Sequence, residues 1–211
     1  MKGAIFDVDG TLLDSMNVWW KVTSDFFRNN NIVITNDMAA EYKEMPLEES
    51  IPIIIKEFGL NMTVEEIIGE FQKMIEKEYR ENIQLKPYAG EYIKQLSSSG
   101  IKIAIATSGY ESLCRPAFER LGVWQYINAC AFTSEVGVNK GNPDIYLLAA
   151  EKIGVEPCEC VVYEDIVLGI SGAKKGGFIT CAVSDATNAH ETDVLKKEAD
   201  SYIESWKELL Q

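Results

Sequence analysis

The sequence has no long apolar run, a single histidine and few basic residues. Its longest apolar runs, such as Ile53–Ile55, are far shorter than the roughly 20 residues that a membrane-spanning helix needs. Met-Lys-Gly leads directly into a strand-like segment, so we expect no signal peptide. These absences predict a protein without a membrane partner.

Acidic residues outnumber basic ones by 33 to 20, which gives a net charge of -13 over 211 residues. Such a chain is poorly suited to bind nucleic acid or an anionic membrane surface. The excess also repels an anionic substrate at long range. A bound cation or a lysine must therefore offset that repulsion wherever such a substrate binds.

Five cysteines form an odd set, and no secretory segment accompanies them. This pattern predicts a reducing compartment and a cytoplasmic protein. Cys158 and Cys160 resemble half of a metal site, but no matching ligands occur elsewhere in the sequence. We therefore assign these two residues a structural or incidental role.

Short apolar runs alternate with amphipathic segments through most of the chain. The strand-like runs are Gly3–Phe6, Ile101–Ala106, Cys160–Tyr163 and Phe178–Val183. Each is nearly continuous in apolar residues, as in a sheet that helices cover on both faces. Glycines at 100, 122 and 154 follow the amphipathic segments and fit helix ends. The alternation predicts an α/β core with a Rossmann-like parallel sheet.

Residues 15–84 interrupt this alternation with helical patterns only. One predicted helix begins near Asp14 or Ser15, and a second runs from Pro46 to Gly59. Thr63-Val64-Glu65-Glu66 has the form of a capping box that opens a third, long helix. We predict a core domain of residues 1–14 plus 85–211 and an inserted all-helical domain of residues 15–84, which can cover a site at the sheet edge as a lid.

The first strand ends in Asp7-Val8-Asp9-Gly10-Thr11. Carboxylates at i and i+2 lie on the same side of an extended chain, and Gly10 allows a sharp turn after them. One carboxylate can attack a phosphorus atom and the other can handle a proton, while a hard cation holds the phosphate. The alternative interpretation is a strand followed by an acidic turn.

Three further groups follow later elements. Thr107-Ser108 comes after a strand, where hydroxyl and backbone N–H groups can hold phosphate oxygens or cap the next helix. Lys140 precedes a helix, a position usual for a solvated surface lysine. Glu164-Asp165 ends an apolar strand, where the two carboxylates either bind a metal or cap a helix.

Together, in this order and spacing, the four groups resemble the motifs of the haloacid dehalogenase superfamily. The resemblance runs from residue 2 to about residue 183 and includes the helical insertion. Gly-Asn-Pro-Asp-Ile-Tyr and Val-Val-Tyr-Glu-Asp resemble the β-phosphoglucomutase-like phosphatase branch. The resemblance implies a Rossmann-like core with a helical cap and Mg²⁺-dependent phosphoryl transfer to and from an aspartate.

The resemblance also implies roles for single residues. Asp7 would be the nucleophile that forms an aspartyl-phosphate, and Asp9 the general acid and then base. Thr107 and the backbone of Ser108 would hold the phosphoryl oxygens, and Lys140 would offset their charge.

The same resemblance implies a metal site. Asp7, the backbone carbonyl of Asp9, and Asp165 would bind Mg²⁺, and Glu164 would help to hold the ion. Magnesium prefers hard oxygen ligands and keeps several waters, which suits a few carboxylates.

Departures from the family pattern guide the choice of reaction. Asp9 is present, which favours phosphate esters over carbon–halogen or carbon–phosphorus bonds. Trp19 stands where β-phosphoglucomutases have a cap histidine, and no matching arginine occurs near Met45. We therefore predict a phosphatase acting on a small phosphate monoester, such as a sugar phosphate. A sugar phosphomutase and a non-catalytic binding module are the alternatives.

Substrate specificity is expected to depend on the helical insertion. Met16, Trp19, Glu44 and Met45 are the candidates for lining a pocket there, and Trp19 is the predicted substrate contact. The sequence shows no long exposed apolar stripe, so we expect a monomer.

Overall fold

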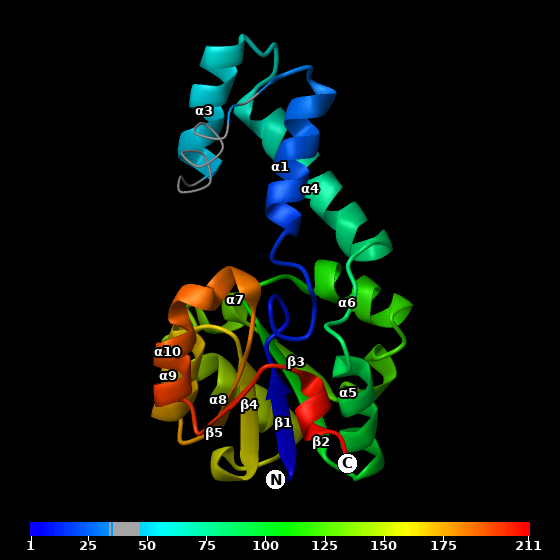
Figure 1. Cartoon of the computed structure of the whole chain (residues 1–211), viewed down its shortest axis with the longest axis vertical. Helices are drawn as coiled ribbons and strands as arrows, with labels where there is room; N and C mark the ends of the chain where they lie inside the picture. Colours follow the sequence, from blue (N-terminus) through cyan, green and yellow to red (C-terminus); the bar gives the residue numbers. More distant parts are fainter. Residues whose placement is uncertain (34, 36–46) are drawn as a thin grey trace. The chain divides into compact units, whose positions relative to one another are not determined.

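The computed structural model describes residues 1–33, 35 and 47–211, without the side chains of residue 19 and residues 47–49. Its core is a six-stranded parallel sheet of strand order β3-β2-β1-β4-β5-β6 (Figure 1). The strands are β1 (Gly3–Phe6), β2 (Lys102–Thr107), β3 (Ala129–Phe132), β4 (Cys160–Glu164), β5 (Ile179–Val183) and β6 (Ser201–Ile203). The predicted parallel α/β fold is confirmed.

Helices occupy most of the remaining described chain. The α-helices are α1 (Val18–Asn29), α3 (Leu47–Phe58), α4 (Val64–Glu81), α5 (Ala89–Ser98), α6 (Glu111–Arg120), α7 (Thr133–Val136), α8 (Asp144–Ile153), α9 (Val167–Lys175) and α10 (Thr192–Glu198). Short 3-10 helices are η1 (Trp124–Tyr126), η2 (Pro157–Glu159), η3 (Ala186–Glu191) and η4 (Trp206–Leu209). Within the described ranges, none of the helices combines the length and the apolar character that crossing a bilayer requires.

The chain divides into two compact units. One contains Met1–Met16 and Tyr79–Gln211, and the other contains Asn17–Glu78. The second unit holds α1, α3 and most of α4, in the interval where the sequence pattern is helical. Residues 15, 16 and 79–84, assigned from the sequence to the insertion, belong by their contacts to the first unit.

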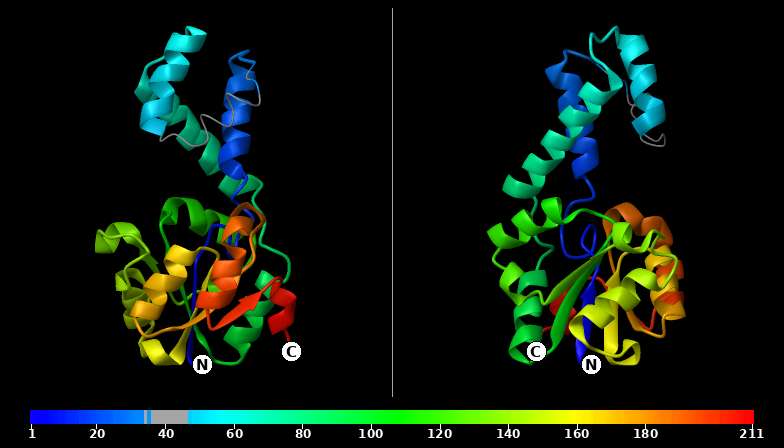
Figure 2. Two further views of the ribbon diagram at one scale, coloured as in Figure 1. Left: turned by 60° about the vertical axis from the view of Figure 1, so that its left-hand side comes forward. Right: turned by 180° about the vertical axis from the view of Figure 1, so that it is seen from behind.

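Helices cover both faces of the sheet. Helices α8, α9 and α10 lie on one face, and α5 and α6 lie on the other (Figures 1 and 2). Right-handed crossovers explain this arrangement, because the chain runs from β1 to β3 in one direction across the sheet and from β4 to β6 in the other. The order therefore switches between β1 and β4, where ligands of such sheets bind.

Side chains of β1 alternate between the two faces. Ile5 belongs to the apolar cluster that includes Tyr146 of α8. Phe6 packs on the opposite face, where its ring stacks on Tyr163 at 4.7 Å and lies 5.6 Å from Trp206. The same alternation directs Asp7, the next residue after the strand, toward the α8 side.

Local signals in the sequence account for several element boundaries. β1 coincides with the predicted strand, and the observed β2 starts one residue later than expected. The capping box at the start of α4 is confirmed, since Thr63 N donates to Glu66 Oε2 at 2.8 Å and Glu66 N to Thr63 Oγ1 at 3.2 Å. β3 and β6, two short strands of four and three residues, were not predicted from the sequence.

Two glycines inside helices have opposite surroundings. A Cβ on Gly172 of α9 would collide with the backbone carbonyl of Lys140 and approach Asn142 O at 2.9 Å. A Cβ on Gly69 of α4 would meet no atom of the described residues within 4 Å outside the backbone of its own helix. Gly172 thus lets α9 pack directly against the loop that carries Lys140.

We predict opposite effects of alanine at these two positions. Gly172→Ala should lower the free energy of unfolding by about 2 kcal/mol or more, because backbone must move. Gly69→Ala should raise it by roughly 0.5–1 kcal/mol, because alanine favours the helix. Urea unfolding monitored by circular dichroism measures both. Equal stability of the two variants would contradict this packing argument.

Candidate active site

The acidic and hydroxyl groups predicted from the sequence follow three neighbouring strands. Asp7 comes directly after β1, Thr107 ends β2, and Glu164 and Asp165 lie at the end of β4. β1 pairs with both β2 and β4, so these residues meet at the carboxyl edge of the sheet. Gly10 has a φ of 84° and turns the chain away immediately after the two aspartates.

A buried cluster of charges forms at this edge. Asp7, Lys140, Glu164 and Asp165 are exposed by only 4%, 5%, 0% and 2%. Lys140 Nζ donates to Asp7 Oδ1 and, at 2.7 Å, to Glu164 Oε1. Single oxygens of Asp7, Glu164 and Asp165 lie within 4.8 Å of one another. Three carboxylates face one ammonium group, so two negative charges are left over when all are ionised.

Glu164 has one satisfied and one unsatisfied oxygen. Its Oε1 accepts hydrogen bonds from Lys140 Nζ and Tyr146 Oη, each at 2.7 Å. Its Oε2 is buried and has no hydrogen-bond partner among the residues that the structure describes. A buried acceptor without a donor is costly, and a cation offsets that cost either directly or through water. The free oxygen and the two uncompensated charges fit a divalent cation with hard oxygen ligands.

Hydrogen bonds hold Asp165 on the opposite side of the cluster. The Thr11 hydroxyl lies 3.1 Å from Asp165 Oδ1 and 3.2 Å from Asp7 Oδ2. Asn188 Nδ2 donates to Asp165 Oδ2 at 2.5 Å. Asn188 was not predicted from the sequence, because it has no motif around it. Tyr146, also missed, ends the Asn-Pro-Asp-Ile-Tyr segment.

Burial and mutual repulsion shift the proton affinities of the cluster. Burial, followed by the charge of Asp7, raises the pKa values of both Glu164 and Asp165. Burial disfavours the charged form of Lys140, but Asp7 and Glu164 outweigh it and raise the pKa of this lysine. Lys140 is therefore charged and supplies fixed positive charge beside Asp7.

Asp9 lies in different surroundings from Asp7. Its Oδ1 accepts a hydrogen bond from Ser15 Oγ at 2.6 Å and another from Tyr79 Oη. Burial and the nearby charge of Asp7 raise the pKa of Asp9. This favours a protonated Asp9 next to a lysine-paired Asp7, as an acid and a nucleophile require.

Thr107 and Ser108 differ in exposure. Thr107 is buried, and its Oγ1 accepts a hydrogen bond from Gly109 N at 2.9 Å, which fixes the turn. Ser108 is exposed. A Cβ on Gly109 would lie 3.3 Å from Thr107 Oγ1 and 3.5 Å from Asp9 Oδ2. The turn after β2 therefore lies beside the free oxygen of Asp9.

The residues predicted to line a substrate pocket are only partly described. Met16 is half-buried and belongs to the first unit, where its Cγ would lie 3.1 Å from a Cβ on Gly10. Glu44, Met45 and the side chain of Trp19 lie outside the described part of the chain. Substrate contact by Trp19 stays a prediction.

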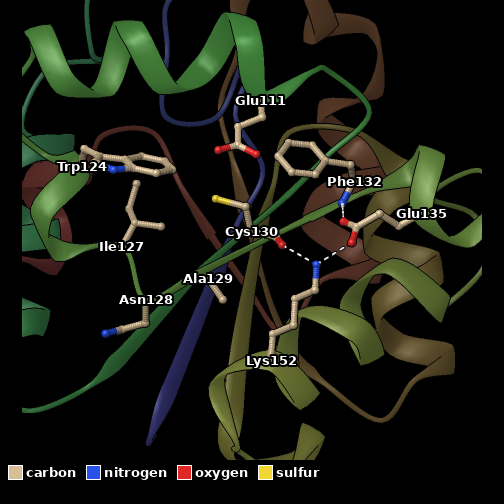
Figure 3. A pocket seen from close by; sticks show the side chains of 9 residues that line it. All are labelled: Glu111, Trp124, Ile127, Asn128, Ala129, Cys130, Phe132, Glu135 and Lys152. Atoms are coloured by element: carbon tan, nitrogen blue, oxygen red, sulfur yellow. Dashed lines mark hydrogen bonds and ion pairs between the residues drawn. The ribbon is translucent and has the colours of Figure 1, made fainter.

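A pocket of 410 Å³ lies at the edge of the sheet along β3 (Figure 3). It shares no residue with the charged cluster; its lining is Glu111, Trp124, Ile127, Asn128, Ala129, Cys130, Phe132, Glu135 and Lys152. Lys152 Nζ donates to Cys130 O at 2.7 Å and to Glu135 Oε1 at 2.6 Å, so its charge is already paired. Among the described residues that line this pocket, none therefore offers a free cation to an anionic substrate.

Comparison with known proteins identifies the class to which this fold and site belong. Residues 4–183 match the haloacid dehalogenase-like hydrolase family, and the chain belongs to that family. This confirms the resemblance seen in the motifs.

Individual relatives carry phosphatase and mutase names. A phosphorylated carbohydrates phosphatase of Thermotoga maritima is 27% identical over 84% of this chain and 82% of its own length. A β-phosphoglucomutase of Bacillus subtilis is 27% identical over 94% of this chain and 90% of its own length. A crystal structure of a Thermotoga maritima protein with the provisional name β-phosphoglucomutase has a TM-score of 0.85 and 25% identity, covering 100% of this chain and 97% of that one.

The repulsion within the cluster generates a test without any substrate. Asp165→Asn removes one of three buried carboxylates and keeps a side chain that can hydrogen-bond to Thr11 and Asn188. In EDTA, we expect it to raise the free energy of unfolding by about 1 kcal/mol. The control Glu151→Gln, at an exposed position of α8, should change it by less than about 0.5 kcal/mol. A metal-free Asp165→Asn protein less stable than the wild type would contradict the charge count.

Proposed function

We propose that this protein is a Mg²⁺-dependent phosphatase that hydrolyses a small phosphate monoester, a sugar phosphate or similar metabolite, through an aspartyl-phosphate. The main support is the buried pairing of Asp7 with Lys140 beside the unsatisfied oxygen of Glu164. A nucleophilic carboxylate, a fixed cation and a vacant acceptor are the parts that phosphoryl transfer needs. The sugar-phosphate class follows the name of the Thermotoga phosphatase relative.

The proposed Mg²⁺ ligands are side-chain oxygens of Asp7 and Asp165, the backbone carbonyl of Asp9, and Glu164 directly or through water. When bound, Mg²⁺ supplies positive charge that offsets the charge of the phosphoryl group. Thr11, Asn188 and the Lys140–Glu164 pair hold the carboxylates of this set in place.

Asp7 is the proposed nucleophile. One of its carboxylate oxygens forms a bond to phosphorus while the bond from phosphorus to the ester oxygen breaks. Lys140 offsets negative charge on both Asp7 and the phosphoryl oxygens, and Thr107 and Ser108 contribute hydrogen-bond donors to those oxygens. In the second step, water attacks phosphorus and releases Asp7 and inorganic phosphate.

Asp9 is the proposed acid and base. It gives a proton to the departing ester oxygen in the first step and takes a proton from water in the second. Its raised pKa supports the first role, because a protonated carboxyl group is required at the start.

Residues 15–84 are the proposed cap domain, with Met16, Trp19, Glu44 and Met45 as contributors to specificity. The monomeric state and the cytoplasmic location also stay predictions.

Substitution of Met16, Trp19, Glu44 or Met45 should change KM for the preferred ester. Unchanged kinetics in all four variants would remove these residues as candidates.

A sugar phosphomutase is the second candidate, since one relative carries that name. Against it, Trp19 takes the place of the mutase histidine, and the sole histidine of the sequence, His190, has a side chain that is 74% exposed in η3. A mutase also has to keep water from its phospho-enzyme. Hydrolysis therefore fits this chain better.

Turnover of phosphate esters tests the proposed function. Wild-type protein should release inorganic phosphate from members of a panel of small phosphate esters, and omission of Mg²⁺ should abolish it. Asp7→Asn should lower kcat by at least about 10⁴-fold, because no nucleophile remains. Asp193→Asn, at an exposed position in α10, is the control and should keep full activity. Isomer interconversion that depends on a sugar bisphosphate and outpaces hydrolysis would establish the mutase instead.

A second prediction separates metal binding from catalysis. Mg²⁺ should raise the Tm of the wild type in differential scanning calorimetry, because ligands that bind the folded state stabilise it. Asp7→Asn and Asp165→Asn should lose most of this shift. An unchanged shift in both variants would place the cation elsewhere.

A further inference from the structure

Among the described residues, hydrogen-bond donors reach only one oxygen of the Asp9 carboxyl group. Both described donors, Ser15 Oγ and Tyr79 Oη, reach Oδ1. The Ser15 contact measures 2.6 Å. A carboxyl oxygen has two lone pairs, so two donors saturate it. The other oxygen, Oδ2, accepts no hydrogen bond from the described residues.

The saturation of Oδ1 decides where a proton on Asp9 sits. A proton on Oδ1 would face two O–H donors and displace one of them. A proton on Oδ2 keeps both hydrogen bonds. Oδ2 lies beside the turn after β2, since a Cβ on Gly109 would be 3.5 Å from it and 3.3 Å from Thr107 Oγ1. The proton is thus directed to the side where phosphoryl oxygens are proposed to bind.

The two hydroxyl groups come from the places where the chain passes between its two units. Ser15 lies just before Asn17, the first residue of the helical unit, and Tyr79 follows Glu78, its last residue. Both belong to the first unit, as Asp9 does. Arg120 of α6 fixes the Tyr79 segment, because its Nη2 donates to Tyr79 O at 3.2 Å and to Ile83 O. The backbone that carries the tyrosine is therefore tied to α6 within the first unit.

We propose that Tyr79 and Ser15 are positioning residues for the acid step: they occupy Oδ1 of Asp9 and so place the transferable proton on Oδ2. The inference rests on the phosphatase function proposed above. In that step the Oδ2–H bond breaks, the proton goes to the departing ester oxygen, and Asp9 becomes a carboxylate. The two hydroxyl donors stabilise the new charge, because hydrogen bonds to an ionised acceptor are the stronger ones.

The leaving group provides the decisive test. An alkyl phosphate needs a proton on its departing oxygen, whereas p-nitrophenyl phosphate expels a stable anion and needs little help. The ratio kcat/KM reports every step through loss of the leaving group. We expect Tyr79→Phe to lower kcat/KM by about 10- to 100-fold for the preferred alkyl phosphate. For p-nitrophenyl phosphate we expect kcat/KM to fall by less than about 3-fold, and we expect KM to stay nearly unchanged for both substrates.

Three further variants frame the measurement. Ser15→Ala should show the same leaving-group selectivity, and Asp9→Asn should show a larger version of it. Tyr202→Phe removes a hydroxyl group from β6, which is remote in sequence from the site. It should leave kcat/KM unchanged for both substrates. Circular dichroism and Tm of each variant establish that it is folded.

Each outcome decides the proposal. Equal losses with both substrates would show that Tyr79 supports binding or structure and would overturn it, as would full activity of Tyr79→Phe and Ser15→Ala. A wild type that hydrolyses neither ester in Mg²⁺ would overturn the proposed function itself. Metal-dependent turnover by the wild type that is lost in Asp7→Asn would support the proposed function. The leaving-group selectivity of Tyr79→Phe and Ser15→Ala then decides the positioning role by itself.

Discussion

The site depends on a lysine ammonium group buried among carboxylates. Lys140 sits between Asp7 and Glu164, with almost no contact with solvent. Without it, the buried carboxylates at the ends of β1 and β4 would repel one another with no internal compensation. The packing around it is correspondingly tight, because only glycine at position 172 lets α9 approach the carbonyl of Lys140. The position of Lys140 therefore depends both on its carboxylate partners and on the close packing of α9 against its backbone.

The negative charges of the cluster are only partly compensated. In the described part of the chain, one ammonium group does not neutralise three carboxylates, and Glu164 Oε2 has no donor. A folded protein tolerates such a deficit where binding of a cation and an anionic substrate depends on it. Asp9 lies just outside this cluster and has hydroxyl partners instead of a lysine. Two aspartates two residues apart therefore have the different environments that a nucleophile and an acid need.

Much of the core could be predicted from local patterns. β1 and the glycine-terminated helices follow from residue types close in sequence, although β1 pairs with β2 and β4, which lie far along the chain. In the helical unit, the α4 capping box follows from a short-range hydrogen-bond pair. β3 and β6 were missed because they are short and only partly buried, so their apolar signal is weak. The four motif groups were found because strand ends in a parallel sheet share one edge, which makes their juxtaposition predictable from sequence order.

The hydrogen-bonding partners of those groups were not predictable. Tyr79 lies 70 residues from Asp9, and Asn188 lies 23 residues from Asp165. No spacing rule links such positions, because the link depends on how the chain returns to the sheet edge. The sequence by itself determined the parallel α/β class, the helical insertion and the residue types at the strand ends. Only the tertiary structure decided which carboxylate oxygen stays free, since that depends on long-range contacts at the scale of a hydrogen bond.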